Sequence, residues 1–491
     1  MNYRAAYTLG MQLALQEKLG ELQTELQPHQ QRVVDRLREQ DGLLAIHGLG
    51  SGKTLTSLAV AEDQGLPATA VVPAALQGNY KKEIQKHFEP GTAPKIDVAS
   101  MQGTALRRTP IHTGTLIIDE AHRLRNQGTL GASVLGKAEA QKRLLMTATP
   151  FYNHPSDIAS PLNIAAGQKI LPTDPQEYER RYIQRDIVNP SFGQRLTTGV
   201  GPGEVAHINP NRREELARVF NQYVDYHPNT ENDPNFPRMT EHTVNVDMSP
   251  QQLEVYDGLL GKLPPWVSAK IRSGLPPSKQ ESKQLNAFLS AVRQVANTTR
   301  GFAPNQAPQE PKIQRAVQDL QEMLRKNDQG KAVVYSNYLG SGLAPYADHL
   351  TRAHIPYGML TGELNAAQKA ALVEQYNSNK IKALLISSAG GEGIDLKGTR
   401  MMQLLEPGWN EAKADQIEGR GIRFLSHEHL PLDQREVQVN RYIAQRPQTF
   451  LSDLGLTHRG QAVDEYLTAM GQRKQELIDE FYGLMPREQS A

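Results

Sequence analysis

A strand-like apolar run that leads directly into a glycine-rich turn and then a helix constrains the fold of this chain most. The run LLAI at 43–46 is followed by HGLGSGKT at 47–54 and by TSLAVAE at 56–62. A turn of this kind exposes several backbone N–H groups at a helix N-terminus, where the helix dipole favours anionic oxygens. The segment therefore predicts a phosphate-binding loop at one edge of a parallel α/β sheet.

The residue types in this loop suit a nucleotide. The Lys53 ammonium would reach the β- and γ-phosphates, and the Thr54 hydroxyl would ligate Mg²⁺. The full pattern asks for glycine at position 47, where this chain has His47. The alternative is an ordinary glycine turn, which the strand-to-helix setting disfavours. The remaining candidate phosphate-binding positions are Gly48, Gly50, Ser51 and Gly52.

Further apolar runs alternate with helix-like stretches in two parts of the chain, up to about residue 165 and again after about residue 312. This alternation is typical of βαβ units in parallel sheets. It predicts an α/β fold with two lobes. The runs are TAVV at 69–72, TLII at 115–118, RLLM at 143–146, KAVVYS at 331–336, KALLIS at 382–387 and MMQLL at 401–405.

The stretch between the two lobes has a different composition. Residues 151–330 contain 18 of the 31 prolines, a density that is hostile to a regular central sheet. We therefore predict a helical insertion there, and helix-like periodicity at both ends of the chain predicts a leader helix and a C-terminal helical brace. The expected boundaries are 1–25 for the leader helix, 26–165 for lobe 1, 166–311 for the insertion, 312–450 for lobe 2 and 451–491 for the C-terminal helices.

Composition excludes several classes of protein. The chain has 491 residues and no cysteine, so it has no disulfide framework, zinc ribbon or thiol nucleophile. No apolar stretch approaches the roughly 18 residues of a membrane span, and no signal peptide is evident. We expect a soluble, intracellular protein without a membrane partner. The net charge of +1 neither supports nor excludes a nucleic-acid partner.

Two carboxylates end one of the apolar runs, in TLIIDEAH. Ligands bind at the carboxyl ends of strands in parallel sheets. Asp119 would hold Mg²⁺ through its water shell, and Glu120 would polarise the water that attacks a phosphate. The alternative is two solvated acids that cap the following helix.

The second lobe contains a polar cluster of another kind, in QIEGRGIR. Gln416, Arg420 and Arg423 are spaced by four and three residues and would share one face of a helix. Two guanidinium groups and an amide suit the charge of a phosphoryl transition state, although a solvated basic face is the common alternative. Because lobe 1 has the phosphate loop and lobe 2 the arginines, each supplies what the other lacks.

Two weaker candidates complete the nucleotide site. In SSAGGEGIDL, Gly393 would allow close approach of the backbone to phosphate or nucleic acid, and Asp395 would accept a hydrogen bond from a ribose hydroxyl. In LQPHQ, the Gln30 amide can donate and accept at once, as the edge of adenine requires. A structural turn and a surface glutamine are the respective alternatives.

Taken in order, the segments LQPHQ, GLGSGKT, VVPAAL, DEAH, TATP, VVYSNY, SSAGGEGIDL and QIEGRGIR resemble the motifs of superfamily 2 helicases and translocases. VNVDMSPQQLEVY at 244–256, PGWNEAKADQIEGRGIR at 407–423 and the long insertion resemble the Swi/Snf-like branch. The segment FLSHEHLPLDQREVQVNRYI resembles helicase-like ATPases of large DNA viruses and phages. The resemblance implies a P-loop NTPase of two RecA-like lobes that uses ATP and Mg²⁺ in the cytoplasm of a prokaryote or an infected cell.

The resemblance also implies a function and a partner. We expect a DNA-stimulated ATPase that moves along or unwinds duplex or single-stranded DNA as a monomer, with RNA as a possible partner. Contacts to backbone phosphates would make binding independent of sequence and sensitive to salt. The alternatives are an RNA-directed or protein-displacing ATPase and a weakly hydrolysing ATP-binding scaffold. By matching motif positions, the implied nucleic-acid contacts are Pro73, Ala74, Ser100, Ser336, Asn337, Ser387 and Ser388.

Three positions depart from the Swi/Snf pattern. Residues 224–227, Val-Asp-Tyr-His, stand where that branch has a basic stretch, Ala414 stands in place of an aspartate, and the third motif reads Ala-Thr-Pro rather than Gly-Thr-Pro. Superfamily membership is unaffected by these departures, but they argue against chromatin-type remodelling.

Overall fold

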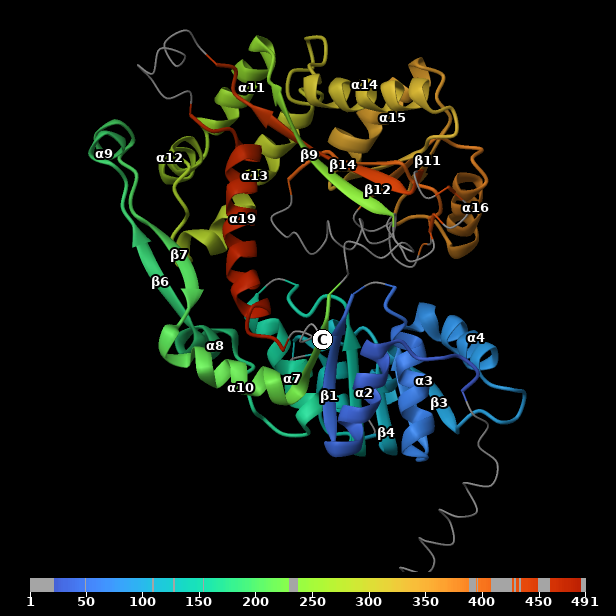
Figure 1. Ribbon diagram of the computed structural model, residues 1–491. Coiled ribbons are helices and arrows are strands. Elements are labelled where there is room, and N and C mark those ends of the chain that lie inside the picture. The colour runs from blue at the N-terminus through green and yellow to red at the C-terminus, as the bar shows by residue number, and fades with distance from the viewer. Residues whose placement is uncertain are drawn as a thin grey trace, which may run out of the picture. The chain divides into compact units, whose positions relative to one another are not determined.

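The computed structural model divides the chain into two compact units (Figure 1). Unit 1 comprises Met1–Gln184, Ile208–Thr230 and Ile478–Ala491, and unit 2 comprises Arg185–His207 and Glu231–Leu477. The structure describes residues 22–48, 50–107, 110–126, 129–152, 154–228, 237–387, 394, 396–407, 426–427, 430–431, 434–448 and 460–486. Nearly all of the predicted leader helix therefore lies outside the described residues.

Unit 1 is built on a six-stranded sheet in the order β3-β2-β4-β5-β1-β8, and each neighbouring pair is parallel. All six residues of β1 are buried, as expected for a parallel sheet with helices on both faces. The strands are β1 (Gly42–His47), β2 (Ala68–Val72), β3 (Ile96–Ser100), β4 (His112–Ile118), β5 (Glu139–Thr147) and β8 (Val224–His227). The helices include α2 (Pro28–Glu39), α3 (Lys53–Gln64), α4 (Gln77–His87), α5 (Met101–Arg107), α6 (Leu130–Leu135), α7 (Ala159–Ala166), α8 (Pro175–Tyr182) and α10 (Arg213–Tyr223).

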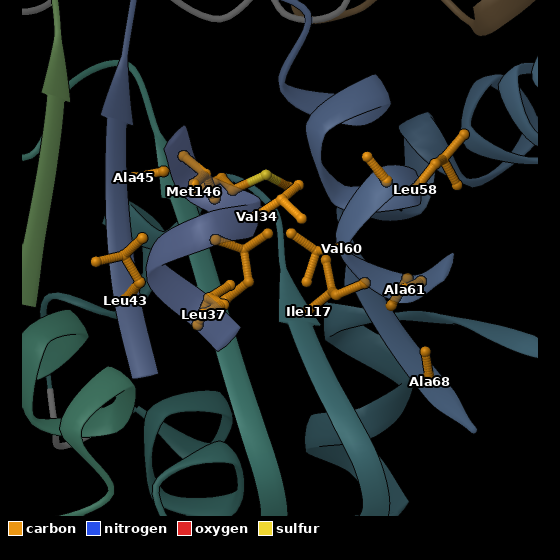
Figure 2. Packing of buried hydrophobic residues seen from close by; sticks show 14 of the residues in the cluster. Val34, Leu37, Leu43, Ala45, Leu58, Val60, Ala61, Ala68, Ile117 and Met146 are labelled. Atoms are coloured by element: carbon orange, nitrogen blue, oxygen red, sulfur yellow. The ribbon is translucent and has the colours of Figure 1, made fainter. Parts of the chain in front are cut away.

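The core of unit 1 fixes α2 and α3 against the sheet. Val34 and Leu37 of α2 and Val60 of α3 belong to one buried cluster with Ile117 of β4 and Met146 of β5 (Figure 2). Full burial of such a side chain contributes about 1.5–3 kcal/mol. This packing holds α3, which follows β1 through the glycine-rich turn, against the sheet.

Unit 2 has a second six-stranded parallel sheet, in the order β11-β12-β10-β13-β14-β9. The predicted α/β class with two parallel-sheet lobes is confirmed. The strands are β9 (Arg238–Asp247), β10 (Ala332–Ser336), β11 (Tyr357–Leu360), β12 (Ala383–Ser387), β13 (Met401–Leu404) and β14 (Glu436–Gln445). The helices include α11 (Pro250–Leu260), α12 (Pro265–Ser273), α13 (Lys279–Asn297), α14 (Pro311–Lys326), α15 (Ala344–Arg352) and α16 (Ala366–Asn377).

The proline-rich stretch expected to be a helical insertion also contains strands. β8 and β9 are the edge strands of the two large sheets, and β6 (Ile183–Val188) pairs with β7 (Gly203–Ile208), with α9 (Phe192–Thr198) between them in sequence. Proline is tolerated at sheet edges and strand ends because the N–H group that it lacks has no neighbouring strand to bind there. Proline density therefore excluded central strands from this stretch, but not edge strands.

The C-terminal helix α19 (Val463–Tyr482) belongs to both units. Tyr466 and Leu467 are buried in the core of unit 2, whereas the Phe481 and Tyr482 rings contact Phe151 in unit 1. It falls in the region predicted as a C-terminal brace. Across the described part of the chain, no helix is both long and apolar enough to cross a membrane.

Candidate nucleotide site and nucleic-acid contacts

The glycine-rich loop forms the turn that its sequence predicts. Gly50 and Gly52 have left-handed backbones, with φ of +78° and +74°, a conformation that glycine adopts without steric cost. A Cβ atom at Gly52 would also lie 2.3 Å from Nε2 of Gln30, so a side chain there would displace this amide. The helix begins at the next residue, Lys53, and its first N–H groups have no partner within the helix. These are the groups to which a phosphate would bind.

Polar side chains of the loop bind its own backbone. Lys53 Nζ donates to the carbonyl oxygens of His47 at 3.1 Å and Gly48 at 2.9 Å, and Ser51 Oγ donates to that of Gly48 at 2.8 Å. The ammonium is thus held over the loop, where it would meet a phosphate. Thr54, the predicted Mg²⁺ ligand, is the second residue of α3 and half-buried.

Gln30 lies beside this loop and is only 3% exposed. Its Nε2 donates to the carbonyl oxygen of Ser51 at 3.0 Å, and its Oε1 accepts from Gln27 N–H at 2.9 Å. His29 Nε2 is 2.9 Å from the same Ser51 oxygen, a contact that sequence reasoning missed. The side chains of α2 therefore hold the phosphate loop in place.

The predicted carboxylate pair follows β4. Asp119 N–H donates to the Val71 carbonyl oxygen at 3.0 Å, and Asp119 Oδ1 accepts from Glu120 N–H at 2.9 Å. Glu120 has a left-handed backbone, with φ of +52°, which costs a non-glycine residue about 1–2 kcal/mol. His122 Nδ1 lies 3.3 Å from Glu120 Oε2 and 3.1 Å from Thr147 Oγ1. The strain is located where a reactive carboxylate is expected.

The two carboxylates differ in acidity. Burial and the neighbouring charge of Glu120 raise the pKa of Asp119 to about 6. Burial acts on Glu120 in the same sense, but the hydrogen bond with His122 and the charges of His122, Lys53 and Arg123 outweigh it, so the pKa of Glu120 is below its ordinary value. Glu120 is therefore ionised at neutral pH and able to act as a base.

These residues fit a nucleotide with Mg²⁺. The like charges at Asp119 and Glu120 would be relieved by a divalent cation. Among the described residues, no group of three or more His, Cys, Asp or Glu side chains is arranged to hold a metal. A Mg²⁺ bound by one carboxylate, one hydroxyl and phosphate oxygens needs no such group.

The predicted nucleic-acid contacts of unit 1 lie at the ends of adjacent strands. β2 and β3 are parallel, with Val72 opposite Ser100. Pro73 and Ala74 directly follow β2, and therefore lie at the same edge of the sheet as Ser100. Ser100 Oγ accepts from Gly103 N–H at 2.9 Å, which fixes the turn into α5.

The contacts predicted for unit 2 are arranged in the same way. Ser336 ends β10 and is paired with Ser387, which ends β12. Buried Glu406, which sequence reasoning missed, accepts from Ser336 Oγ at 2.7 Å and from Asn337 N–H at 2.8 Å. It also accepts from Asn297 Nδ2 of α13. An apolar run that ends in a carboxylate was the available signal, and it is the same signal that identified Asp119.

Several predicted residues lie outside the described part of the chain. They are Ser388, Gly393, Asp395, Gln416, Arg420 and Arg423. The expectation that arginines of lobe 2 complete the site of lobe 1 therefore stays a prediction.

Two protein-family models match the chain. The SNF2-related domain matches residues 104–300, and the helicase conserved C-terminal domain matches residues 315–425. Together they span more than half of the chain. The SNF2-related match ends within the proline-rich stretch 151–330, and the helicase C-terminal match begins near the end of that stretch. The two matches define a helicase-type ATPase.

Two viral proteins and one solved structure are similar to this chain over most of its length. A protein of Acanthamoeba polyphaga mimivirus named "Putative ATP-dependent RNA helicase" is 28% identical over 474 residues, which cover 93% of this chain and 95% of that protein. A "Termination factor NPH-I homolog" of African swine fever virus is 24% identical, with 91% of this chain and 75% of that protein covered. The SWI2/SNF2 ATPase core of Sulfolobus solfataricus in complex with dsDNA aligns at 16% identity and a TM-score of 0.36, covering 94% of this chain and 97% of that one. Through the two domain matches, which together cover more than half of its residues, the chain belongs to the SNF2-related helicases, as its ordered motifs predicted.

Proposed function

We propose that this protein is an ATP-dependent DNA helicase or translocase, in which ATP hydrolysis drives movement along DNA independently of base sequence. The observation that carries the proposal is that unit 1 contains both a glycine-rich loop, to whose backbone the Lys53 ammonium donates, and a carboxylate, Glu120, that is ionised because its pKa is lowered. The SNF2-related and helicase C-terminal domains support it.

The phosphates of ATP would be bound by the backbone N–H groups at the start of α3 and by the Lys53 ammonium. Mg²⁺, held by Thr54 and Asp119, would neutralise charge on the phosphate oxygens. Glu120 would orient a water for in-line attack on the γ-phosphorus and take up its proton. His122, between Glu120 and Thr147, would fix the direction of the Glu120 carboxylate.

Charge on the transferred phosphoryl group requires further donors. We assign this role to Gln416, Arg420 and Arg423, which QIEGRGIR places at helical spacing. Gly393 and Asp395 are proposed to bind the nucleotide as well. Closure of the two lobes around ATP and their release after hydrolysis would then drive stepping along a strand.

The strand-end residues of both units are proposed to bind DNA phosphates. Pro73, Ala74 and Ser100 offer small side chains and backbone groups in unit 1, while Ser336, Asn337 and Ser387 do so in unit 2, with Ser388 as the next residue. Such contacts position a strand without reading its sequence. The name of the mimivirus relative favours RNA as a second candidate substrate.

Steady-state ATPase assays with duplex DNA, single-stranded DNA and RNA test the proposal. Stimulation by either form of DNA is expected, and RNA-only stimulation would select the second candidate. If no nucleic acid stimulates turnover, the motor function is excluded. Strand displacement on 3′- and 5′-tailed duplexes, beside triplex displacement, then separates unwinding from translocation alone.

A further inference from the structure

Two positions at which the sequence departs from the expected motifs are in contact in the structure. His47 occupies the glycine position of the phosphate-loop pattern, and Asp225 lies in the stretch 224–227 that is basic in the Swi/Snf pattern. In the β1–β8 pair Asp225 lies opposite Ala45, two residues before His47 on the same strand, and His47 Nε2 lies 2.7 Å from Asp225 Oδ1. Both side chains are buried, with 0% and 1% exposure. Each departure therefore supplies the partner that the other needs.

Helix α2 adds two arginines to this pair. Arg32 binds Asp225 through two hydrogen bonds, from Nε to Oδ2 at 2.8 Å and from Nη2 to Oδ1 at 2.9 Å. Arg36 Nη1 lies 3.6 Å from Asp225 Oδ2 and also donates to the carbonyl oxygen of Val224. Burial alone would raise the pKa of Asp225, but the hydrogen bonds from His47 and Arg32 hold it far below its ordinary value. Because burial lowers the pKa of His47, the imidazole is neutral and donates its Nε2 proton to the carboxylate.

The phosphate loop itself is tied to β8. Gly48 N–H donates to the His227 carbonyl oxygen at 2.9 Å, which extends the β1–β8 ladder into the loop. The His29 ring stacks on the His227 ring, with centroids 3.9 Å apart and planes 3° from parallel. His29 Nε2 is in turn within 2.9 Å of the Ser51 carbonyl oxygen. Displacement of β8 would therefore displace the backbone that binds phosphate.

β8 is also the strand after which the chain passes from unit 1 to unit 2, at Thr230 and Glu231. We propose that His47, Asp225 and Arg32 form a positioning cluster that couples the phosphate loop to this strand, so that binding of nucleic acid changes ATP turnover through β8. This inference rests on the proposed function, since it requires nucleic-acid-stimulated hydrolysis. None of the three residues touches the reacting atoms, and their effect is exerted through the loop.

Three variants of the full chain test the cluster. His47→Leu removes the donor to Asp225 at similar volume, whereas His47→Gln can place an amide N–H where the imidazole Nε2 lies. Asp225→Asn keeps an acceptor but removes the charge that Arg32 binds. The readout is the ratio of nucleic-acid-stimulated to unstimulated ATP turnover, measured beside the melting temperature. For His47→Leu and Asp225→Asn we expect this ratio to fall about fivefold or more, which is the lower end of typical coupling between two sites. For His47→Gln we expect it to fall less than about twofold.

Asp63→Asn is the matched control. Asp63 of α3 accepts a hydrogen bond at 2.8 Å from Nε of Arg38, which lies on α2 as Arg32 does. Loss of this charged acceptor should leave the ratio unchanged. A purely structural role would lower stimulated and unstimulated turnover in proportion, with a lower melting temperature, and would overturn the proposal. An unchanged ratio in His47→Leu would also overturn the proposal. The same holds if the ratio falls as much in His47→Gln as in His47→Leu. A wild-type protein that no nucleic acid stimulates would instead contradict the proposed function.

Discussion

The carboxylates that directly follow buried strand runs have different surroundings in the two units. In unit 2, Glu406 is 3% exposed and accepts hydrogen bonds from Ser336, Asn337 and Asn297. In unit 1, Asp119 and Glu120 are adjacent like charges, and the pKa of Asp119 is raised to about 6, first by burial and then by the charge of Glu120. A carboxylate surrounded by donors stabilises the elements around it, whereas a pair in need of positive charge is prepared to bind a ligand.

Asp464 belongs with Glu406. It is fully buried at the start of α19, where it pairs with Lys312 of α14 at 2.6 Å and accepts from Ala444 N–H of β14 at 2.9 Å. Three elements of unit 2 meet at this one carboxylate. The comparison therefore separates carboxylates that maintain the fold from the pair proposed to act in hydrolysis, and substitution should reveal the difference.

The largest effect is expected for Glu120→Gln. Loss of the proposed base should lower ATP turnover by about 10²- to 10⁴-fold, while nucleotide binding is retained because the phosphate loop is intact. The melting temperature should fall only slightly, because the removed charge is favoured by His122 and Lys53 but also lies beside that of Asp119. Turnover and nucleotide affinity are measured in parallel. Near-normal hydrolysis would refute the role of Glu120.

Asp464→Asn should have the opposite profile. Removal of one partner leaves the Lys312 charge buried and unpaired, which costs about 3–5 kcal/mol. The midpoint of denaturant unfolding of unit 2 should fall strongly, while turnover per folded molecule changes little. Glu322→Gln, which breaks the exposed pair with Lys326, is the control and should leave the midpoint unchanged. An equal midpoint for both variants would contradict the structural role of Asp464.

Glu406→Gln should affect nucleic-acid binding more than chemistry. An amide cannot accept from all the donors around this position, so the Ser336–Asn337 turn loses a fixed support. We expect the concentration of nucleic acid that half-maximally stimulates the ATPase to rise about tenfold, equivalent to about 1.4 kcal/mol.

Glu310→Gln is a matched control for this prediction. Glu310 is another buried acid of unit 2, and it binds Thr298 and His349. If both variants weaken nucleic-acid binding equally, the effect reflects general loosening of unit 2 and Glu406 has no particular role.

Gln30→Ala should have the smallest effect and tests whether Gln30 reads the base or supports the loop. Both ends of its amide bind backbone, so its loss should weaken ATP and GTP binding alike, by about threefold to tenfold for one or two hydrogen bonds. Competition binding with the two nucleotides measures this. A loss confined to ATP would favour the adenine contact that the motif implies.

The residues predicted from sequence are those whose chemistry is local. Gly48, Gly50, Ser51 and Gly52 precede Lys53 and Thr54 of α3 because strand, turn and helix are contiguous in the sequence. Asp119 and Glu120 follow directly from an apolar run that ends in acids. Local backbone preference and hydrophobic periodicity are properties of adjacent residues. For the same reason, the alternation of runs was enough to predict two parallel sheets.

Only the tertiary structure revealed contacts between distant residues. His47 and Asp225 are 178 positions apart, and each alone is merely a departure from a motif. Strands β8 and β9 arise from a proline-rich stretch, and their places at the sheet edges depend on which neighbours offer unpaired backbone groups. Pairing of this kind is decided by the whole sheet. The sequence by itself therefore determined the chemical groups of the phosphate loop and its carboxylates, and the parallel sheet decided which distant side chains hold them in place.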